Sequence, residues 1–418
     1  MKVAIIGSGG REHMILKKIK HNPKITQLFV IPGNAGMQQE ATCVPLDITR
    51  NEEVLGFALE QKLDFVIVSP DNPLVGGMVD VLEEAGIACF GPRQNGAILE
   101  GSKIFAKDFM KRHAIPTAQY WTFSSTQEAI EFLHQASFPI VIKADGLAFG
   151  KGVIIAQTLQ EGVKCLKEMM EEEIFGESGK QVVIEEFLEG KEASILAFCD
   201  GKNIAPMISS MDYKKALDGD QGLNTGGMGC IAPNPYYTKE IAQKCMETIF
   251  LPTLKGLQSE NRDFRGCLYF GLMLTKEGPK VIEYNCRFGD PETQTILPLL
   301  KSDLFEIMLK VSKRELRTED VIFEEKASCC VVLASSGYPK DFEVGHPITY
   351  PSSFEICFAG VKEKDHHLIN SGGRVLSVTS IASTLQEARQ ESYQKISQID
   401  FKNRYYRTDI GKDIEEQQ

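Results

Sequence analysis

The first hundred residues alternate short apolar runs with stretches of amphipathic spacing. Each apolar run is continuous in aliphatic or aromatic side chains, which is typical of a strand buried on both faces. These runs lie at residues 3–6, 27–31, 65–68 and 88–90. Apolar residues recur at helical spacing over residues 12–20, 52–61 and 79–85. The order of elements predicts a parallel α/β sheet covered by helices on both faces.

From residue 101 onward, strands and helices no longer alternate regularly. The pattern predicts helices at residues 101–113, 126–135, 162–172, 239–257 and 304–313. It predicts strands at residues 120–123, 140–143, 153–156 and 181–187, and a hairpin formed by 267–274 and 280–285. A charged stretch at 314–326 precedes a new apolar strand at 328–334. We therefore expect an α/β domain, an α+β domain, a linker and a small C-terminal α+β domain, at residues 1–102, 103–313, 314–327 and 328–418 respectively.

Composition narrows the class of protein. A chain of 418 residues is too long for a single ordinary core, and its 43% hydrophobic content is that of a soluble globular protein. The net charge of −11 argues against nucleic acid or an anionic membrane as the main partner, although a local cationic cleft for small anions stays compatible with it. The 11 cysteines lack zinc-site spacing and fit free thiols. With no signal peptide and no apolar run of membrane length, we expect a cytoplasmic protein.

The most informative segment, residues 283–292, begins at the end of the strand predicted at 280–285. Glu283 and Asn285 share one face of that strand, because side chains alternate along it, and Arg287 continues the face. A carboxylate and an amide oxygen are hard ligands that suit Mg²⁺. Asp290 and Glu292 follow at once. So many charged groups beside an apolar strand predict a site for ions or ligands, because burying them without partners is unfavourable.

Glycine-rich loops supply candidate anion sites. Residues 7–13 link the first strand to the first helix, where backbone N–H groups and the helix dipole favour an anion. A dinucleotide fingerprint would require glycine where Glu12 stands. The loop at 32–36 follows the next strand and therefore lies at the same edge of the sheet. Residues 143–152 form a lysine-containing loop between two strands, a type that covers nucleotide phosphates. A tight turn or an exposed hairpin would explain each loop equally well when it is taken alone.

Taken together, these segments resemble the phosphoribosylamine–glycine ligases, also called glycinamide ribonucleotide synthetases, within the ATP-grasp ligases. The resemblance runs from the first strand to residues 407–411 and rests on the motifs at 9–13, 32–36, 101–103, 143–148, 224–229 and 285–292. It implies a central ATP-grasp domain with a mobile lid subdomain at about 122–190. It also implies that ATP, glycine and 5-phosphoribosylamine react through glycyl phosphate to give glycinamide ribonucleotide, ADP and phosphate. Such a route needs no enzyme nucleophile, and the sequence offers no clear one.

The resemblance assigns roles to individual residues. It implies an ATP site formed by Lys103, Lys143, Gly146, Gly150, Lys151, Gly152, Glu185, Glu186, Phe187, Leu188 and Glu192. Glu283 and Asn285 would bind Mg²⁺, with Mn²⁺ as an alternative, and the catalytic groups would be Lys143, Arg287, Asp290 and Glu292. The implied substrate-binding residues are Gly10, Arg11, Gly33, Asn34, Gly36, Asp71, Asp212, Lys214, Asn224 and Arg287. Neither a nucleic-acid partner nor a membrane is implied.

Several positions depart from the family pattern. Tyr213 and Lys215 stand where His and Arg are usual, and Asp71 stands in place of Glu. Gly271 occupies a place where many ATP-grasp ligases carry a metal-binding carboxylate. Two other functions therefore stay open from the sequence. One is an ATP-grasp carboxylate–amine ligase with a different substrate, and the other is a non-catalytic nucleotide-binding protein on the same scaffold.

Overall fold

Five parallel strands form the N-terminal sheet in the computed structural model, which describes residues 1–148 and 152–412. Their order is β3-β2-β1-β4-β5, so the first strand lies at the centre. The strands are β1 (Lys2–Gly7), β2 (Gln27–Pro32), β3 (Thr42–Cys43), β4 (Phe65–Val68) and β5 (Ala88–Phe90). The helices between them are α1 (Gly10–Ile19), α2 (Asn51–Gln61), α3 (Asp71–Val75) and α4 (Met78–Glu84). The predicted parallel sheet is confirmed.

Alternate residues of β1 enter two different hydrophobic clusters. Ala4 and Ile6 pack in one cluster with the central domain, whereas Val3 and Ile5 pack in another. Helix α12 (Leu304–Lys313) covers the second face, with the Phe305 ring 5.6 Å from the ring of Phe65. The N-terminal sheet is therefore buried on both faces, which explains its uninterrupted apolar strands.

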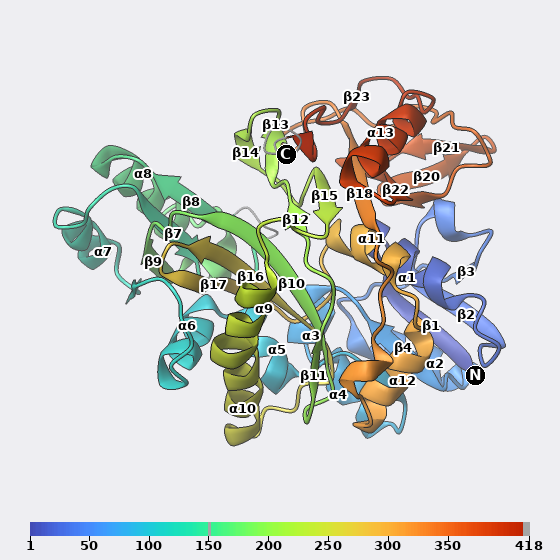
Figure 1. The fold of residues 1–418 in the computed structure, drawn as a ribbon, viewed down its shortest axis with the longest axis horizontal. Coiled ribbons are helices and arrows are strands. Elements are labelled where there is room, and N and C mark those ends of the chain that lie inside the picture. The colour runs from blue at the N-terminus through green and yellow to red at the C-terminus, as the bar shows by residue number, and fades with distance from the viewer. Residues whose placement is uncertain (149–151, 413–418) are drawn as a thin grey trace.

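Two antiparallel sheets follow. The lid sheet has the order β6-β9-β7-β8 and consists of β6 (Tyr120–Phe123), β7 (Ile140–Ala144), β8 (Val153–Ala156) and β9 (Val182–Glu186), with helices α7 (Thr126–Leu133) and α8 (Leu159–Met170). The central sheet has the order β11-β10-β16-β17 and consists of β10 (Lys191–Cys199), β11 (Ile204–Pro206), β16 (Gly266–Thr275) and β17 (Gly278–Asn285). Its neighbouring helices are α5 (Gln94–Gly101), α6 (Lys103–Arg112), α9 (Lys239–Cys245) and α10 (Leu251–Ser259). Figure 1 shows the lid at one end of the molecule, opposite the two terminal domains.

Two predicted helices differ in the structure. The helix expected at 101–113 is divided at Ser102, whose hydroxyl accepts a hydrogen bond from the Phe105 amide at 3.0 Å and so begins α6. The helix expected at 239–257 contains a π-helical segment, Met246–Phe250, between α9 and α10. Pro252 follows this segment and has no N–H to donate, so a regular ladder of hydrogen bonds cannot pass through it.

The C-terminal sheet takes two strands from the middle of the chain. Its order is β12-β15-β18-β22-β19, and β23 also pairs with β18. The strands are β12 (Met211–Asp212), β15 (Gly229–Ala232), β18 (Ala327–Ser335), β19 (Ile356–Phe358), β22 (Arg374–Ala382) and β23 (Arg404–Tyr405), with helix α13 (Leu385–Ile396) packed on β18 and β22. Two separate hairpins are β13 (Lys215–Leu217) with β14 (Gln221–Asn224), and β20 (Val361–Lys364) with β21 (His367–Asn370). Strands β12 and β15 thus join the C-terminal sheet to the loops of the central domain.

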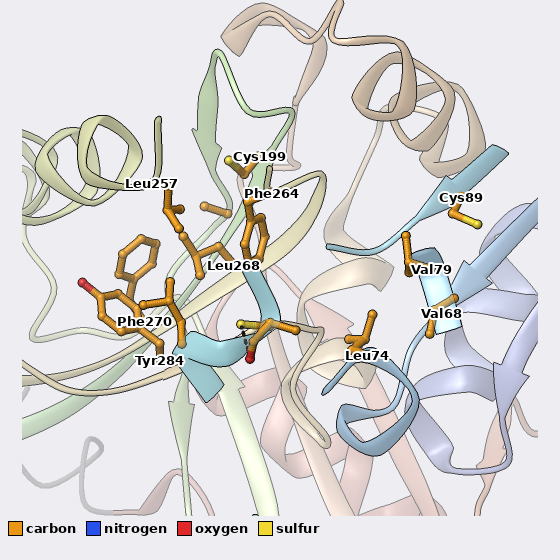
Figure 2. Close-up of a cluster of buried hydrophobic side chains, with 14 of the residues drawn as sticks. Val68, Leu74, Val79, Cys89, Cys199, Leu257, Phe264, Leu268, Phe270 and Tyr284 are labelled. Carbon is orange, nitrogen blue, oxygen red and sulfur yellow. Dashed lines mark hydrogen bonds between the residues drawn. The ribbon is translucent and has the colours of Figure 1, made fainter. Parts of the chain in front are cut away.

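One hydrophobic cluster joins the N-terminal domain to the central sheet. Figure 2 shows Val68 and Leu74 of the first domain on one side and Phe270 and Tyr284 of the central sheet on the other. The Phe270 ring lies 4.4 Å from Phe250. All 11 cysteines are free. No helix in the described part of the chain is both long enough and apolar enough to cross a membrane.

Truncating a side chain in this shared cluster should destabilise the whole chain. Phe270 is fully buried, so Phe270→Ala should lower the free energy of unfolding by about 3–5 kcal/mol through lost contacts and the cavity left behind. The control Leu59→Ala, at a side chain that is 52% exposed, should change it by less than about 1 kcal/mol. Urea-induced unfolding of both variants measures the difference, and equal effects would contradict a shared core at Phe270.

Candidate active site between two sheets

A bulge in β17 shapes the predicted metal site. Gly271 of β16 pairs with Glu283, but the next residue, Leu272, pairs with Val281, so Ile282 is an extra residue. A Cβ atom at position 271 would stand 3.0 Å from the Cγ atom of Glu283. Glycine at this position therefore leaves room for the Glu283 side chain, and a carboxylate there would have to displace it.

Glu283 lies in a cationic environment. Its Oε1 is 3.9 Å from the Nζ atom of Lys214, and its side chain keeps 31% exposure. Burial would raise the pKa of Glu283, but the ammonium groups of Lys214, Lys143 and Lys103 lower it below its usual value, so the carboxylate is ionised. The Oδ1 atom of Asn285 accepts a hydrogen bond from Arg287 at 3.1 Å and retains a second lone pair.

The oxygen donors at the end of β17 suit one kind of metal. In the described ranges, no group of three or more His, Cys, Asp or Glu residues could bind a metal ion. One ionised carboxylate and one amide oxygen fit Mg²⁺, which completes its shell with water and substrate phosphates.

The predicted phosphate-binding Lys143 is paired with Glu185 in the interior. The Lys143 Nζ atom lies 2.8 Å from Glu185 Oε1 and donates to the carbonyl of Ile282 at 3.1 Å. Lys107 binds the other oxygen of Glu185 at 2.7 Å. The Glu185 carboxylate therefore faces two lysines, and its predicted contact with adenine stays a prediction. Lys107 was not predicted, although its spacing of four residues from Lys103 places both on one helix face.

The other predicted phosphate contact, Lys103, begins helix α6 and reaches the glycine loop. Its Nζ atom donates to the carbonyl of Gly146 at 2.8 Å, and burial lowers the pKa of this ammonium. The Ala144 amide donates to the carbonyl of Gly152 at 2.9 Å, which closes the base of the loop. The predicted contacts Gly150 and Lys151 lie outside the described residues.

The residues at the end of β9, which the sequence predicts to form the adenine hinge, differ in exposure and contacts. The Glu186 side chain accepts a hydrogen bond from the Gln119 amide at 3.0 Å, whereas Phe187 is exposed and Leu188 half-buried. Further along, Glu192 Oε2 pairs with the Nζ atom of Lys214 at 3.1 Å. The structure thus brings the predicted ribose contact, Glu192, to the same lysine that faces Glu283.

Arg287 is held by a carboxylate that the sequence interpretation missed. Its Nη2 atom lies 2.9 Å from Glu100 Oε1, and the other oxygen of Glu100 accepts a hydrogen bond from the Cys286 amide at 2.6 Å. The Nε atom of Arg287 is buried and has no hydrogen-bond partner within the described ranges. Burial is the largest influence on both groups: it raises the pKa of Glu100 and lowers that of Arg287. The nearby charge of Asp71 raises the pKa of each. One buried donor of Arg287 is thus unsatisfied within the described part of the chain.

Two carboxylates accept hydrogen bonds from backbone amides at the N-terminus of α1. Glu12 Oε2 accepts a hydrogen bond from the Gly9 amide at 2.7 Å, and Asp290 Oδ2 accepts one from the Arg11 amide at 3.4 Å. The Arg11 side chain donates to the carbonyl of Phe288 at 3.0 Å. A Cβ atom at position 10 would stand 2.5 Å from the Gln294 amide nitrogen, so a larger residue there would displace the Gln294 side chain. These contacts join the first predicted anion loop to the segment after β17.

The second predicted anion loop is tied to the C-terminal domain. The Asn34 amide group donates to the carbonyls of Ser8 at 2.8 Å and Phe358 at 3.0 Å. A Cβ atom at position 36 would stand 2.3 Å from the Phe358 ring, and Gly33 has a φ of +70°. The loop thus keeps its predicted glycines for close packing and backbone conformation, while the Asn34 side chain fixes its position.

Two acidic side chains face each other on the other side of the β17 end. Tyr269 donates to Glu292 Oε1 at 2.9 Å. The Oδ1 atom of Asp212 is buried without a hydrogen-bond partner among the described residues. Burial, and then the charge of Glu292, raise the pKa of Asp212 well above its usual value. Asn224, at the end of β14, pairs with Lys215 and lies one residue before the loop that crosses this region.

Arg374 of the C-terminal domain contacts two segments that border the site. Its Nη1 atom donates to the carbonyls of Gly226 and Asp290, each at 2.7 Å, and lies 3.3 Å from Asp290 Oδ1. It therefore joins the 224–229 loop to the segment after β17. The sequence does not predict this contact, because Arg374 and Asp290 lie 84 residues apart in the chain.

Three domains of one protein family match three consecutive parts of the chain. The N domain of phosphoribosylglycinamide synthetase matches residues 1–100, its ATP-grasp (A) domain residues 101–293, and its C domain residues 328–413.

Several curated proteins are similar over nearly the full length. The phosphoribosylamine–glycine ligases of Fusobacterium nucleatum and Clostridium acetobutylicum are each 45% identical, and the match covers 98% and 99% of this chain and 98% and 100% of those proteins. The trifunctional purine biosynthetic protein adenosine-3 of Gallus gallus is also 45% identical, over 98% of this chain but 42% of that protein.

Solved structures agree with this similarity. A phosphoribosylamine–glycine ligase from Thermotoga maritima superposes with a TM-score of 0.88 at 36% identity. The superposition covers 98% of this chain and 100% of that one. The biotin carboxylase domain of a Hydrogenobacter thermophilus 2-oxoglutarate carboxylase, crystallised with magnesium ADP, gives a TM-score of 0.75 at 17% identity, covering 97% and 91% of the two chains. The second likeness concerns the fold alone.

Removing the bridge made by Arg374 should impair the site more than the fold. Arg374→Met should lower turnover roughly 10- to 100-fold, because the 224–229 loop loses its fixed position beside Asp290. The exposed Arg317→Met serves as the control and should be close to wild type. Steady-state kinetics and thermal melting of both variants provide the test. Unchanged turnover in Arg374→Met would show that the bridge does not position the loop.

Proposed function

The chain belongs to the phosphoribosylamine–glycine ligase family, and we propose that it joins glycine to 5-phosphoribosylamine in purine biosynthesis, converting ATP to ADP and phosphate. The observation that carries this conclusion is the full-length match to ligases of this name, in three consecutive domains. The chain is accordingly an ATP-dependent ligase. The free cysteines support our placement of the reaction in the reducing cytoplasm.

The first step would join glycine to phosphate. A carboxylate oxygen of glycine attacks the γ-phosphorus of ATP, the bond to the β,γ-bridging oxygen breaks, and glycyl phosphate and ADP result. Lys103 and Lys143 are the cations placed to neutralise phosphate charge, since each lies close enough to Glu283 to lower its pKa. Glu283 and Asn285 would bind Mg²⁺, which supplies further charge neutralisation when bound.

The second step would form the amide. The amine nitrogen of phosphoribosylamine attacks the carbonyl carbon of glycyl phosphate, phosphate leaves, and the nitrogen loses a proton. No protein nucleophile is needed, so catalysis rests on positioning and charge stabilisation. Asp212 and Glu292 are two carboxylates beside the end of β17, and the raised pKa of Asp212 makes its carboxylate a stronger proton acceptor than an ordinary aspartate.

We assign the remaining substrate contacts by the groups that have free hydrogen-bonding capacity. Arg287, with its unpaired Nε, would bind the glycine carboxylate. The backbone of Gly10 and Arg11 and the loop at 33–36 would bind the phosphoribosyl group at the edge of the N-terminal sheet. Asp290, which contacts Arg11, Gln294 and Arg374, would act by fixing these parts relative to one another.

The activity is tested by ADP release from purified protein with ATP, Mg²⁺ and freshly prepared phosphoribosylamine. We expect release to require both glycine and phosphoribosylamine, and mass spectrometry should detect glycinamide ribonucleotide. If release is indifferent to glycine, the substrate assignment is wrong. Omitting phosphoribosylamine while retaining glycine tests whether the acceptor amine is required for turnover.

A second test concerns the metal ligand. Glu283→Gln should reduce turnover roughly 100-fold or more, because the neutral amide binds Mg²⁺ weakly and leaves the phosphate charge less balanced. Raising the Mg²⁺ concentration should recover part of the loss. The matched control is Glu277→Gln on the turn of the same hairpin, where the side chain is 77% exposed, and its turnover should equal wild type. Near-normal activity of Glu283→Gln would remove Glu283 from the metal site.

A further inference from the structure

Lys107 is an ionisable group buried next to the nucleotide region that the proposed function leaves without a role. Its side chain is only 2% exposed, and Glu185 and Lys143, which complete the cluster, are each 4% exposed. The two lysines bind the two oxygens of a single carboxylate, at 2.7 Å and 2.8 Å. Two ammonium groups and one carboxylate leave one positive charge in this cluster.

Both lysines of the cluster are linked by hydrogen bonds to strand β17, which carries Glu283 and Asn285. On one side, Lys107 donates to the Thr117 hydroxyl at 2.8 Å, and that hydroxyl donates to the carbonyl of Val281 at 2.7 Å. On the other side, Lys143 donates to the carbonyl of Ile282, the extra residue of the bulge. Glu185 and Lys143 belong to β9 and β7 of the lid sheet, whereas Val281 and Ile282 belong to β17 of the central sheet. Lys107 thus lies where a network of hydrogen bonds crosses from one sheet to the other.

We propose that Lys107 is a positioning residue for nucleotide binding: by binding Glu185, it fixes the Lys143 ammonium beside the β17 bulge and keeps a net positive charge there for the phosphates. This inference rests on the proposed role of Lys143 at the phosphates of ATP. Lys107 acts through Glu185, and no contact between Lys107 and the nucleotide is required.

The charge balance explains why a second lysine is needed. Without Lys107, Lys143 would be the only cationic partner of the Glu185 carboxylate among the described residues, and a buried charge binds its partner strongly. The Lys143–Glu185 pair would then be neutral as a unit and would attract polyphosphate less. Lys107 satisfies one oxygen of Glu185, so the positive charge of Lys143 is not fully compensated. A purely structural salt bridge, by contrast, would affect folding stability and leave nucleotide affinity unchanged.

Burial also gives this cluster a pH dependence. Burial, with the nearby charge of Lys143, lowers the pKa of Lys107 to about 8, although Glu185 and Glu283 act in the opposite direction. The Thr117 hydroxyl also contacts the Lys107 ammonium. Below this pKa Lys107 is charged and the cluster carries its extra positive charge. Above it the charge is lost, so nucleotide affinity should fall as the pH rises through about 8.

The test measures ADP binding by calorimetry in the presence of Mg²⁺, so the result does not depend on turnover. Lys107→Met should weaken ADP binding about tenfold, the loss expected when a buried charged group loses one partner. KM for ATP should rise by a similar factor, with a smaller change in kcat. Lys111→Met on the exposed part of the same helix is the matched control and should bind ADP as wild type does. The affinity of wild type should fall between about pH 7 and pH 9.5, whereas that of Lys107→Met should stay level.

Lys107→Arg supplies a second test that survives if Lys107→Met folds poorly. The guanidinium stays charged throughout this pH range, so the pH-dependent loss of affinity should disappear. In a double-mutant cycle with Glu185→Gln, the effects of Lys107→Met and Glu185→Gln on ADP affinity should not add, because both act on the same contact. Additive effects, unchanged ADP affinity in Lys107→Met, or a pH step retained in Lys107→Arg would overturn the inference. A wild-type protein that binds ADP but shows no glycine-dependent turnover would instead refute the proposed function.

Discussion

Charged side chains buried beside β17 are stabilised by partners of opposite sign. Lys107 and Lys143 share Glu185, Arg287 pairs with Glu100, and the lysines around Glu283 lower its pKa. Removing one member of such a pair leaves an uncompensated charge in a medium of low polarity, which is strongly destabilising. This constraint places the charged side chains with little freedom and so gives the site its fixed geometry.

The same requirement connects the domains. Asp290 contacts the N-terminus of α1 in the first domain and Arg374 in the last, and Asn34 reaches the backbone of Phe358 in the C-terminal domain. Hydrophobic packing continues across these junctions, since Val68 and Phe270 lie in one cluster (Figure 2). The three sequence-matched domains therefore share cores and polar contacts at the site.

The bulge in β17 shows how a local irregularity of the backbone serves the chemistry. Because Ile282 has no partner in the ladder, its carbonyl is free to bind Lys143, and Glu283 is directed into the space left by Gly271. The departure of Gly271 from the pattern of other ATP-grasp ligases is thus accompanied by a side chain that fills the same region. Beside this strand end, the Nε atom of Arg287 has no hydrogen-bond partner among the described residues.

The sequence by itself determined the parallel sheet, the succession of domains and most of the residues that gather at the site. Continuous apolar strands, glycines at turns and the alternation of Glu283 with Asn285 are local properties, readable over a few residues. Only the tertiary structure decided which of these groups pair. Glu185 faces Lys107 and Lys143, Asp290 faces α1 and Arg374, and Arg287 faces Glu100. Such pairings join residues far apart in the chain, and their energies depend on burial and on distance in space, which a one-dimensional pattern does not contain.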